Sequence, residues 1–172
     1  GTFLFLPDNM GEAELDAALW QFLAELGHEV VIAAKDSFAF GDIDVKGVDA
    51  IIDSPAPLKA HREAGRIKVI KSGYRGEGLV AFKMSGQLEA ALRDPGLKAL
   101  IIKGQANLFM LSARNPVRFP VISILLLKAK TAEKLAGIPF KKDKFWPMAV
   151  VVPPGEAVQI KVTDTTFGGT LK

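Results

Sequence analysis

The chain contains no cysteine, so disulfide bonds, thiolate metal sites and cysteine nucleophiles are excluded. It also lacks a strong excess of charge: 22 basic and 19 acidic residues give a net charge of only +3, without a basic block. With one tyrosine and two tryptophans, a nucleic-acid-binding surface is not expected. The longest mostly apolar run, Val121–Leu127, is too short for a membrane span. We therefore expect a cytoplasmic protein that binds neither nucleic acid nor membrane, while the oligomeric state stays open.

The apolar residues that are present gather in short runs. The chain has 172 residues, of which 49% are hydrophobic, enough for one domain with a full core. Short continuous apolar runs are typical of strands that are buried on both faces, as in a parallel sheet. The expected strands are Phe3–Leu6, Val30–Ala34, Ile67–Ile70, Leu100–Ile102 and Val121–Leu127.

Helical patterns separate several of these strands. The clearest covers Glu14–Leu26, and Gly27 is a suitable residue to end it. Shorter patterns cover Gln87–Leu92 and Thr131–Leu135. The segment 36–64 is ambiguous, because 47–52 is compatible with a further strand and 58–64 with a helix. In the first helix we expect the buried face to consist of Leu15, Leu19, Phe22, Leu23 and Leu26.

The alternation of strands and helices predicts an α/β fold. We expect a three-layer, Rossmann-like open sheet that is mostly parallel and has flanking helices. The tail has two further β-like runs, 149–152 and 157–163, around Pro153–Gly155, which predict a hairpin or edge strands. The expected organisation is therefore an α/β domain over residues 1–145 and a β-rich C-terminal extension over 146–172, packed on the same domain.

Polar residues and glycines follow most of the predicted strands. Ligands of open α/β sheets bind beyond the carboxyl ends of the strands. The residues that share this placement are Asp8, Asn9, Asp42, Ser72, Gly73, Lys103 and Lys130. Their common position is the first indication of a functional site.

Asp8 and Asn9 allow two interpretations. Both residue types are good helix N-caps, because their side-chain oxygens accept hydrogen bonds from free backbone amides. A carboxylate and an amide oxygen are equally suitable ligands for a hard divalent cation. A cation site needs a second carboxylate from another strand end, and Asp42 is the candidate. The alternative for Asp42 is an aspartate in a surface turn after Gly41.

The segment around Lys103 is the candidate phosphate site. In "IIKGQANLFML" the lysine follows a buried strand, and Gly104 allows backbone amides to approach an anion. The alternative is a solvated lysine in a turn. The glycine-rich "KSGYRGEG", which contains Ser72 and Gly73, lacks the Gly-Lys-Ser/Thr of a P-loop, and its glycines fit a turn better.

Together these motifs resemble the metal-dependent damage-control phosphatases, the ARMT-like family. The resemblance covers roughly residues 3–138 in the family's order. Residues 8–12 match the family motif Asp-Asn-x-Gly-Glu, and a further family Asp is matched at position 16. Residues 30–42 match a strand that is followed by a basic residue, here Lys35, and by an Asp, here Asp42. Ser-Gly, Lys-Gly-Gln-x-Asn and Leu-Leu-Lys-x-Lys are matched at 72–73, 103–107 and 126–130. The chain departs from the family pattern at Gly41, Ala106 and Thr131, where the family has Asn, Gly and Cys.

The resemblance implies a function and a role for each matched residue. It implies a manganese, cobalt, nickel or magnesium ion held by Asp8, Asn9 and Asp42, with Asp8, Asp42 and Lys103 as catalytic residues. The residues implied to line the substrate site are Glu12, Ser72, Gly73, Lys103, Gly104, Asn107 and Lys130. The implied activity is hydrolysis of small phosphorylated metabolites, such as sugar phosphates or phosphopantetheine-like damage products.

Two other functions stay open at this stage. One is a non-catalytic module of the same fold that binds metal or phosphate without turnover. The other is a nucleic-acid or partner-binding domain, which the composition disfavours. Family members usually carry a helical region before the first strand, so the chain is either a minimal member or lacks upstream residues.

Overall fold

The computed structural model describes residues 1–37, 41–73, 84–104, 106–107, 118–127 and 146–156. It shows an α/β fold built on one six-stranded sheet with the strand order β3-β2-β1-β4-β5-β6. The strands are β1 (Thr2–Leu6), β2 (Glu29–Ala34), β3 (Ile67–Lys71), β4 (Leu97–Lys103), β5 (Val121–Leu127) and β6 (Trp146–Val152). The first five strands pair in parallel, and β6 pairs antiparallel with β5. The mostly parallel sheet confirms the predicted fold class.

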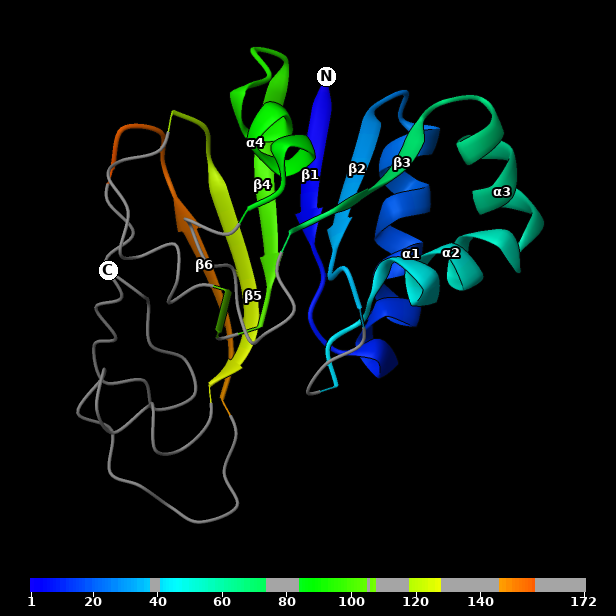
Figure 1. Cartoon of the computed structure of the whole chain (residues 1–172). Helices are drawn as coiled ribbons and strands as arrows, with labels where there is room; N and C mark the ends of the chain where they lie inside the picture. The colour runs from blue at the N-terminus through cyan, green and yellow to red at the C-terminus, as the bar shows by residue number, and fades with distance from the viewer. Residues whose placement is uncertain (38–40, 74–83, 105, 108–117, 128–145, 157–172) are drawn as a thin grey trace.

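Helices cover both faces of the sheet (Figure 1). One face packs against α1 (Met10–Glu25), α2 (Val45–Asp53) and α3 (Ala56–Glu63), and α4 (Gly86–Arg93) covers the other. Alternate residues of each strand supply the two cores: Phe5 faces α1, whereas Leu4 and Leu6 face the α4 side. Because both faces are buried, the central strands read as continuous apolar runs.

The buried face of α1 differs from the prediction. Leu23 is buried and Leu19 is partly buried against the core, as expected, but Leu15, Phe22 and Leu26 are 78%, 56% and 57% exposed. The face that meets the sheet consists of Ala13, Asp16, Ala17, Trp20, Leu23 and Ala24. The prediction was wrong because it chose the face with the largest apolar side chains. Small side chains instead bring the helix close to the sheet, and one large residue, Trp20, fills the space beside Phe5.

The segment 47–52 is also not a strand. It belongs to α2, whose N-cap residue Asp44 accepts a hydrogen bond from the Gly47 amide at 2.9 Å. Val48 and Ile52 are one helical turn apart and both are fully buried. The cap and this spacing outweigh the β-like composition. The helix predicted over 58–64 is confirmed as α3.

The C-terminal part is described only up to residue 156. The strand expected over 149–152 is confirmed as β6 and forms an edge of the sheet. The predicted helix at 131–135 and strand at 157–163 lie outside the described residues, and the division at residue 145 stays a prediction. The helices within the described residues are all too short or too polar to span a membrane.

A pair of substitutions tests the observed orientation of α1. The Trp20 ring is fully buried and meets the Phe5 ring edge-on, with centroids 5.7 Å apart. Trp20→Ala should therefore lower the free energy of unfolding by about 3–5 kcal/mol, the usual cost of removing a large core side chain. Phe22→Ala, on the exposed face of the same helix, should cost about 1 kcal/mol or less. Urea denaturation of both variants decides between the faces, and the reverse ranking would contradict this structure.

Candidate functional site

The candidate site lies where the order of strands in the sheet reverses. From β1 the chain proceeds through β2 to β3 on one side, and then returns to place β4 and β5 on the other. Ligands of open α/β sheets bind at such a switch point, beyond the carboxyl ends of the strands. β1 and β4 pair in parallel with Leu6 opposite Ile102, so Asp8 and Lys103 follow at the same edge.

Asp8, Asn9 and Asp42 are brought together by the backbone. Asn9 and Asp42 form an isolated antiparallel bridge, although they are far apart in the sequence. Next to it, the amide of Ile43 donates a hydrogen bond to the carbonyl oxygen of Asp8 at 2.8 Å. The segment after β2 therefore lies against the segment after β1, which places both predicted acidic ligands at one point of the sheet edge.

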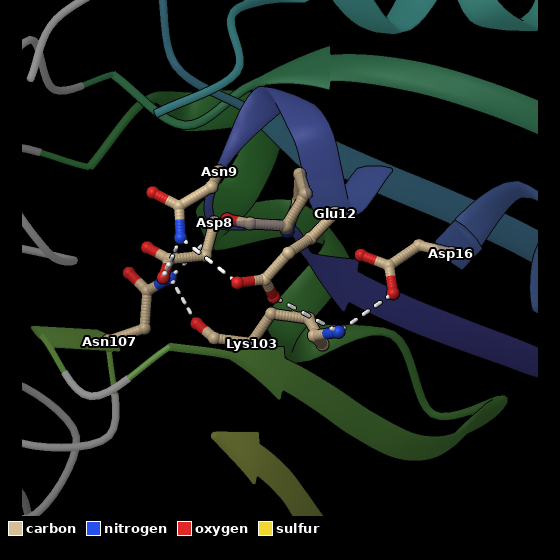
Figure 2. A network of polar contacts seen from close by, with 7 residues as sticks. Asp8, Asn9, Glu12, Asp16, Lys103 and Asn107 are labelled. Atoms are coloured by element: carbon tan, nitrogen blue, oxygen red, sulfur yellow. Dashed lines mark hydrogen bonds and ion pairs between the residues drawn. The ribbon is translucent and has the colours of Figure 1, made fainter. Parts of the chain in front are cut away.

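The Asn9 side chain does not act as a helix cap. Asn9 has the extended conformation of an N-cap residue before α1, but its side chain makes no capping hydrogen bond. Its Nδ2 donates instead to Asp8 Oδ2 at 3.2 Å and to Glu12 Oε1 at 3.1 Å. Figure 2 shows the amide nitrogen directed toward these carboxylates and the amide oxygen on the other side. The oxygen that a cation would require is thus not used in capping.

Asp42 is buried and does not lie in an exposed turn. Its Oδ2 lies 3.5 Å from the Lys35 Nζ, and the two side chains are only 10% and 7% exposed. A buried carboxylate needs such a compensating charge, because desolvation is costly. Lys35 follows β2 directly and was assigned no role from the sequence. Its position between a buried strand and the acidic segment was the available signal.

Lys103 is held between two carboxylates of α1 and is not a solvated lysine. Its Nζ lies 3.0 Å from Asp16 Oδ1 and 3.4 Å from Glu12 Oε2, and its side chain is 13% exposed (Figure 2). Burial by itself lowers the pKa of Lys103, but the hydrogen bond and charge of Asp16, together with Glu12, raise it above its ordinary value. Lys103 therefore remains an ammonium ion at neutral pH.

Asp16 is a member of this network to which the sequence assigned no role. It is 7% exposed on the buried face of α1. Burial raises the pKa of Asp16, the hydrogen bond and charge of Lys103 lower it in part, and the charge of Glu12 adds to the rise. The available signal was the spacing of Glu12 and Asp16, which places both on one side of a helix. The sequence matched Asp16 to a family aspartate but gave it no role, because another face of α1 was expected to be buried.

Gly104 and Asn107 close the network from the β4 side. Gly104 is buried with a φ of 78°, and a Cβ atom there would overlap the Asp8 carboxylate. Asn107 is buried, and its Nδ2 donates to the carbonyl oxygens of Lys103 at 2.9 Å and Pro7 at 3.4 Å. Asn107 thus ties the ends of β1 and β4 together, and its predicted contact with a substrate stays a prediction.

Ser72 and Gly73 lie at the same edge, after β3. The amide of Ser72 donates to the Ala34 carbonyl oxygen at 2.7 Å, and the amide of Gly73 donates to Asp36 Oδ1 at 2.9 Å. Both contacts attach the end of β3 to the end of β2, and their predicted substrate contacts stay a prediction. Lys130, the last predicted site residue, lies outside the described residues.

The donor set and charge of this network fit a divalent cation. Asp8, Asn9 and Asp42 offer two carboxylates and an amide oxygen, which suit a hard cation. The described residues contain no group of three or more His, Cys, Asp or Glu placed to hold a metal ion, so this candidate site combines two carboxylates with an amide oxygen. The network contains four carboxylates (Asp8, Glu12, Asp16, Asp42) and two ammonium groups (Lys35, Lys103). Among the described residues, negative charge therefore exceeds positive charge in this network, which favours a cation there.

The comparison with known proteins places the chain in a family. The model of the damage-control phosphatase ARMT1-like domain matches residues 1–142. A crystal structure of a DUF89 family protein from Pyrococcus horikoshii is similar, with a TM-score of 0.63 and 27% sequence identity. The match covers 90% of this chain and 47% of that protein, so the chain spans about half the length of this relative. No curated protein matches the chain.

The family match includes each of the elements that position the described network. Residues 1–142 contain β1 to β5, the N-terminus of α1 and the segments after β2 and β4. The match also agrees with the order of motifs around Asp8, Asp42 and Lys103 in the sequence. The chain therefore belongs to the family of damage-control phosphatase ARMT1-like domains.

Proposed function

We propose that this protein is a metal-dependent phosphatase that hydrolyses phosphomonoesters of small metabolites. The observation that carries the proposal is the meeting of two functional groups at the switch point between β1 and β4. The proposed cation ligands Asp8, Asn9 and Asp42 lie on one side and the ammonium of Lys103 on the other, and Glu12 contacts both Asn9 and Lys103. Sugar phosphates and phosphopantetheine-like compounds are the proposed substrates, consistent with the damage-control family.

Each group has a chemical role in phosphoryl transfer. Asp8, Asn9 and Asp42 would hold manganese, cobalt, nickel or magnesium, which polarises a phosphoryl group and lowers the pKa of a water nucleophile. Lys103 would stabilise the negative charge on the phosphoryl oxygens. The N-terminus of α1 begins at Met10, beside both groups, and its dipole favours an anion there. Glu12, Ser72, Gly73, Gly104, Asn107 and Lys130 are proposed to line the substrate side.

Turnover separates this proposal from a module that binds metal and phosphate without hydrolysis. Phosphate release from a panel of sugar phosphates and phosphopantetheine, with each of the four metals in turn, should identify at least one substrate. Lys103→Ala should weaken phosphate binding and lower turnover without lowering Mn²⁺ affinity, since an ammonium repels a cation and does not ligate it. Binding of Mn²⁺ and phosphate without turnover across the panel would favour the binding module.

Asp42→Asn tests the cation site. The change keeps the size of the side chain and an oxygen ligand but removes one of the two ligand charges that hold the cation. The affinity for Mn²⁺ should fall at least roughly tenfold, about 1.4 kcal/mol, and Mn²⁺ should raise the melting temperature less than it does in the wild type. The variant should be less stable than the wild type, because Lys35 loses a buried partner. Calorimetric titration should therefore be done well below the melting temperature of the variant.

A remote charge change provides the control for Asp42→Asn. Asp53→Asn removes a carboxylate that is 57% exposed at the end of α2, where it pairs with Arg62. This variant should bind Mn²⁺ like the wild type. Equal Mn²⁺ affinities for Asp42→Asn and Asp53→Asn would remove Asp42 from the ligand set.

Gly104→Ala tests the close approach of β4 to Asp8. The new Cβ would displace the Asp8 carboxylate, so Mn²⁺ affinity should fall at least tenfold, about 1.4 kcal/mol. The left-handed backbone also makes alanine unfavourable by about 1–2 kcal/mol. Gly27→Ala is the matched control, because Gly27 has a similar φ of 82° but open space around the added Cβ. It should carry only the backbone cost and keep its Mn²⁺ affinity. Equal Mn²⁺ affinities in the two variants would contradict the role of Gly104.

A further inference from the structure

The ammonium of Lys103 has two carboxylate partners that differ in their surroundings. Asp16 Oδ1 lies at 3.0 Å and Glu12 Oε2 at 3.4 Å from its Nζ, one helical turn apart on α1 (Figure 2). The Asp16 side chain is 8% exposed, whereas that of Glu12 is 38% exposed. One partner is therefore enclosed by the fold, and the other borders the solvent.

Burial makes the contact with Asp16 the more persistent one. Its other oxygen, Oδ2, is buried and has no hydrogen-bond partner among the described residues, so Lys103 is the main compensation for this carboxylate. An ion pair that is removed from water is weakly screened, and breaking it leaves a buried charge. Glu12 can instead turn toward water at little cost, because its carboxylate is already partly hydrated.

Glu12 occupies a position that suits an incoming anion. Its two oxygens join the Asn9 amide to the Lys103 ammonium, at the N-terminus of α1. A phosphate group offers oxygens of the same charge for the same donors. An ammonium has three hydrogen-bond donors, so Lys103 can keep its bond to Asp16 while another donor passes from Glu12 to a phosphate oxygen.

Given the phosphate-binding role proposed for Lys103, we infer that Asp16 is its positioning residue and that Glu12 is the partner that phosphate displaces. Asp16 holds the end of a flexible four-carbon side chain in place before the anion arrives. The ordering of the side chain is then not a cost of phosphate binding. Glu12 shields the ammonium in the absence of the anion and competes with it.

This arrangement predicts opposite effects from two similar charge removals. Glu12→Gln removes a competing anion and should tighten the binding of inorganic phosphate in the presence of Mn²⁺ at least threefold. Asp16→Asn also removes a negative charge, which by simple Coulomb attraction would tighten phosphate binding. If Asp16 positions Lys103, this variant should instead bind phosphate at least tenfold more weakly. Calorimetric titration of both variants and the wild type with phosphate measures the difference.

The outcomes of the titration separate the possible roles. Opposite shifts support the positioning role. Tighter binding in both variants would show that Asp16 is only one more repelling charge, and an unchanged affinity in Asp16→Asn would show that it is structural; either result overturns the inference. Asp16→Ala replaces Asp16→Asn if the latter does not fold, because alanine is the best helix former and the neighbouring residues Ala13 and Ala17 are small.

A second measurement does not depend on phosphate binding. In ¹⁵N-edited NMR spectra of the metal-free protein, a buried ammonium gives a slowly exchanging signal, which Lys103→Gln would assign. The signal should persist in Glu12→Gln and disappear in Asp16→Asn. Persistence in Asp16→Asn would overturn the inference. If the wild type failed to bind phosphate with any metal, the proposed function would fail, while the NMR result would still decide whether Asp16 holds Lys103.

Discussion

The parallel pairing of β1 with β4 is the constraint on which the site depends. Parallel strands end at the same edge, and these two strands flank the point where the strand order reverses. The helix after β1 and the segment after β4 therefore meet without either having to cross the sheet. Residues 8 and 103 are remote in sequence, and the pairing of β1 with β4 brings them to the same edge.

Charge compensation then determines how the side chains are arranged at this edge. Lys35 pairs with Asp42 and Lys103 pairs with Asp16, and none of the four side chains is more than 13% exposed. Such pairs add little to stability, because desolvation offsets most of the attraction. Their consequence is geometric, since a buried charge stays beside its partner.

Most of the fold could be predicted from the sequence because the central strands are buried on both faces. Continuous apolar runs identified β1 to β5 to within a few residues, and the polar residues after them indicated the functional edge. The predictions failed where two patterns competed. In 47–52 the N-cap Asp44 and the spacing of Val48 and Ile52 favoured a helix, although the composition was β-like. In α1, apolar residues occur all around the helix, so periodicity did not identify the buried face.

The sequence by itself determined the fold class, the family resemblance and which residue types follow each strand, because these depend on local hydrophobic pattern and motif order. Only the tertiary structure decided which side chains meet. In that structure the Asn9 side chain does not cap the helix, and Asp42 is buried against Lys35. Gly104 lies where a side chain would displace the Asp8 carboxylate. The tertiary structure also identified Asp16 as the buried partner of Lys103. The physical reason is that burial and charge pairing are properties of surfaces in contact, and segments from distant parts of the chain supply those surfaces.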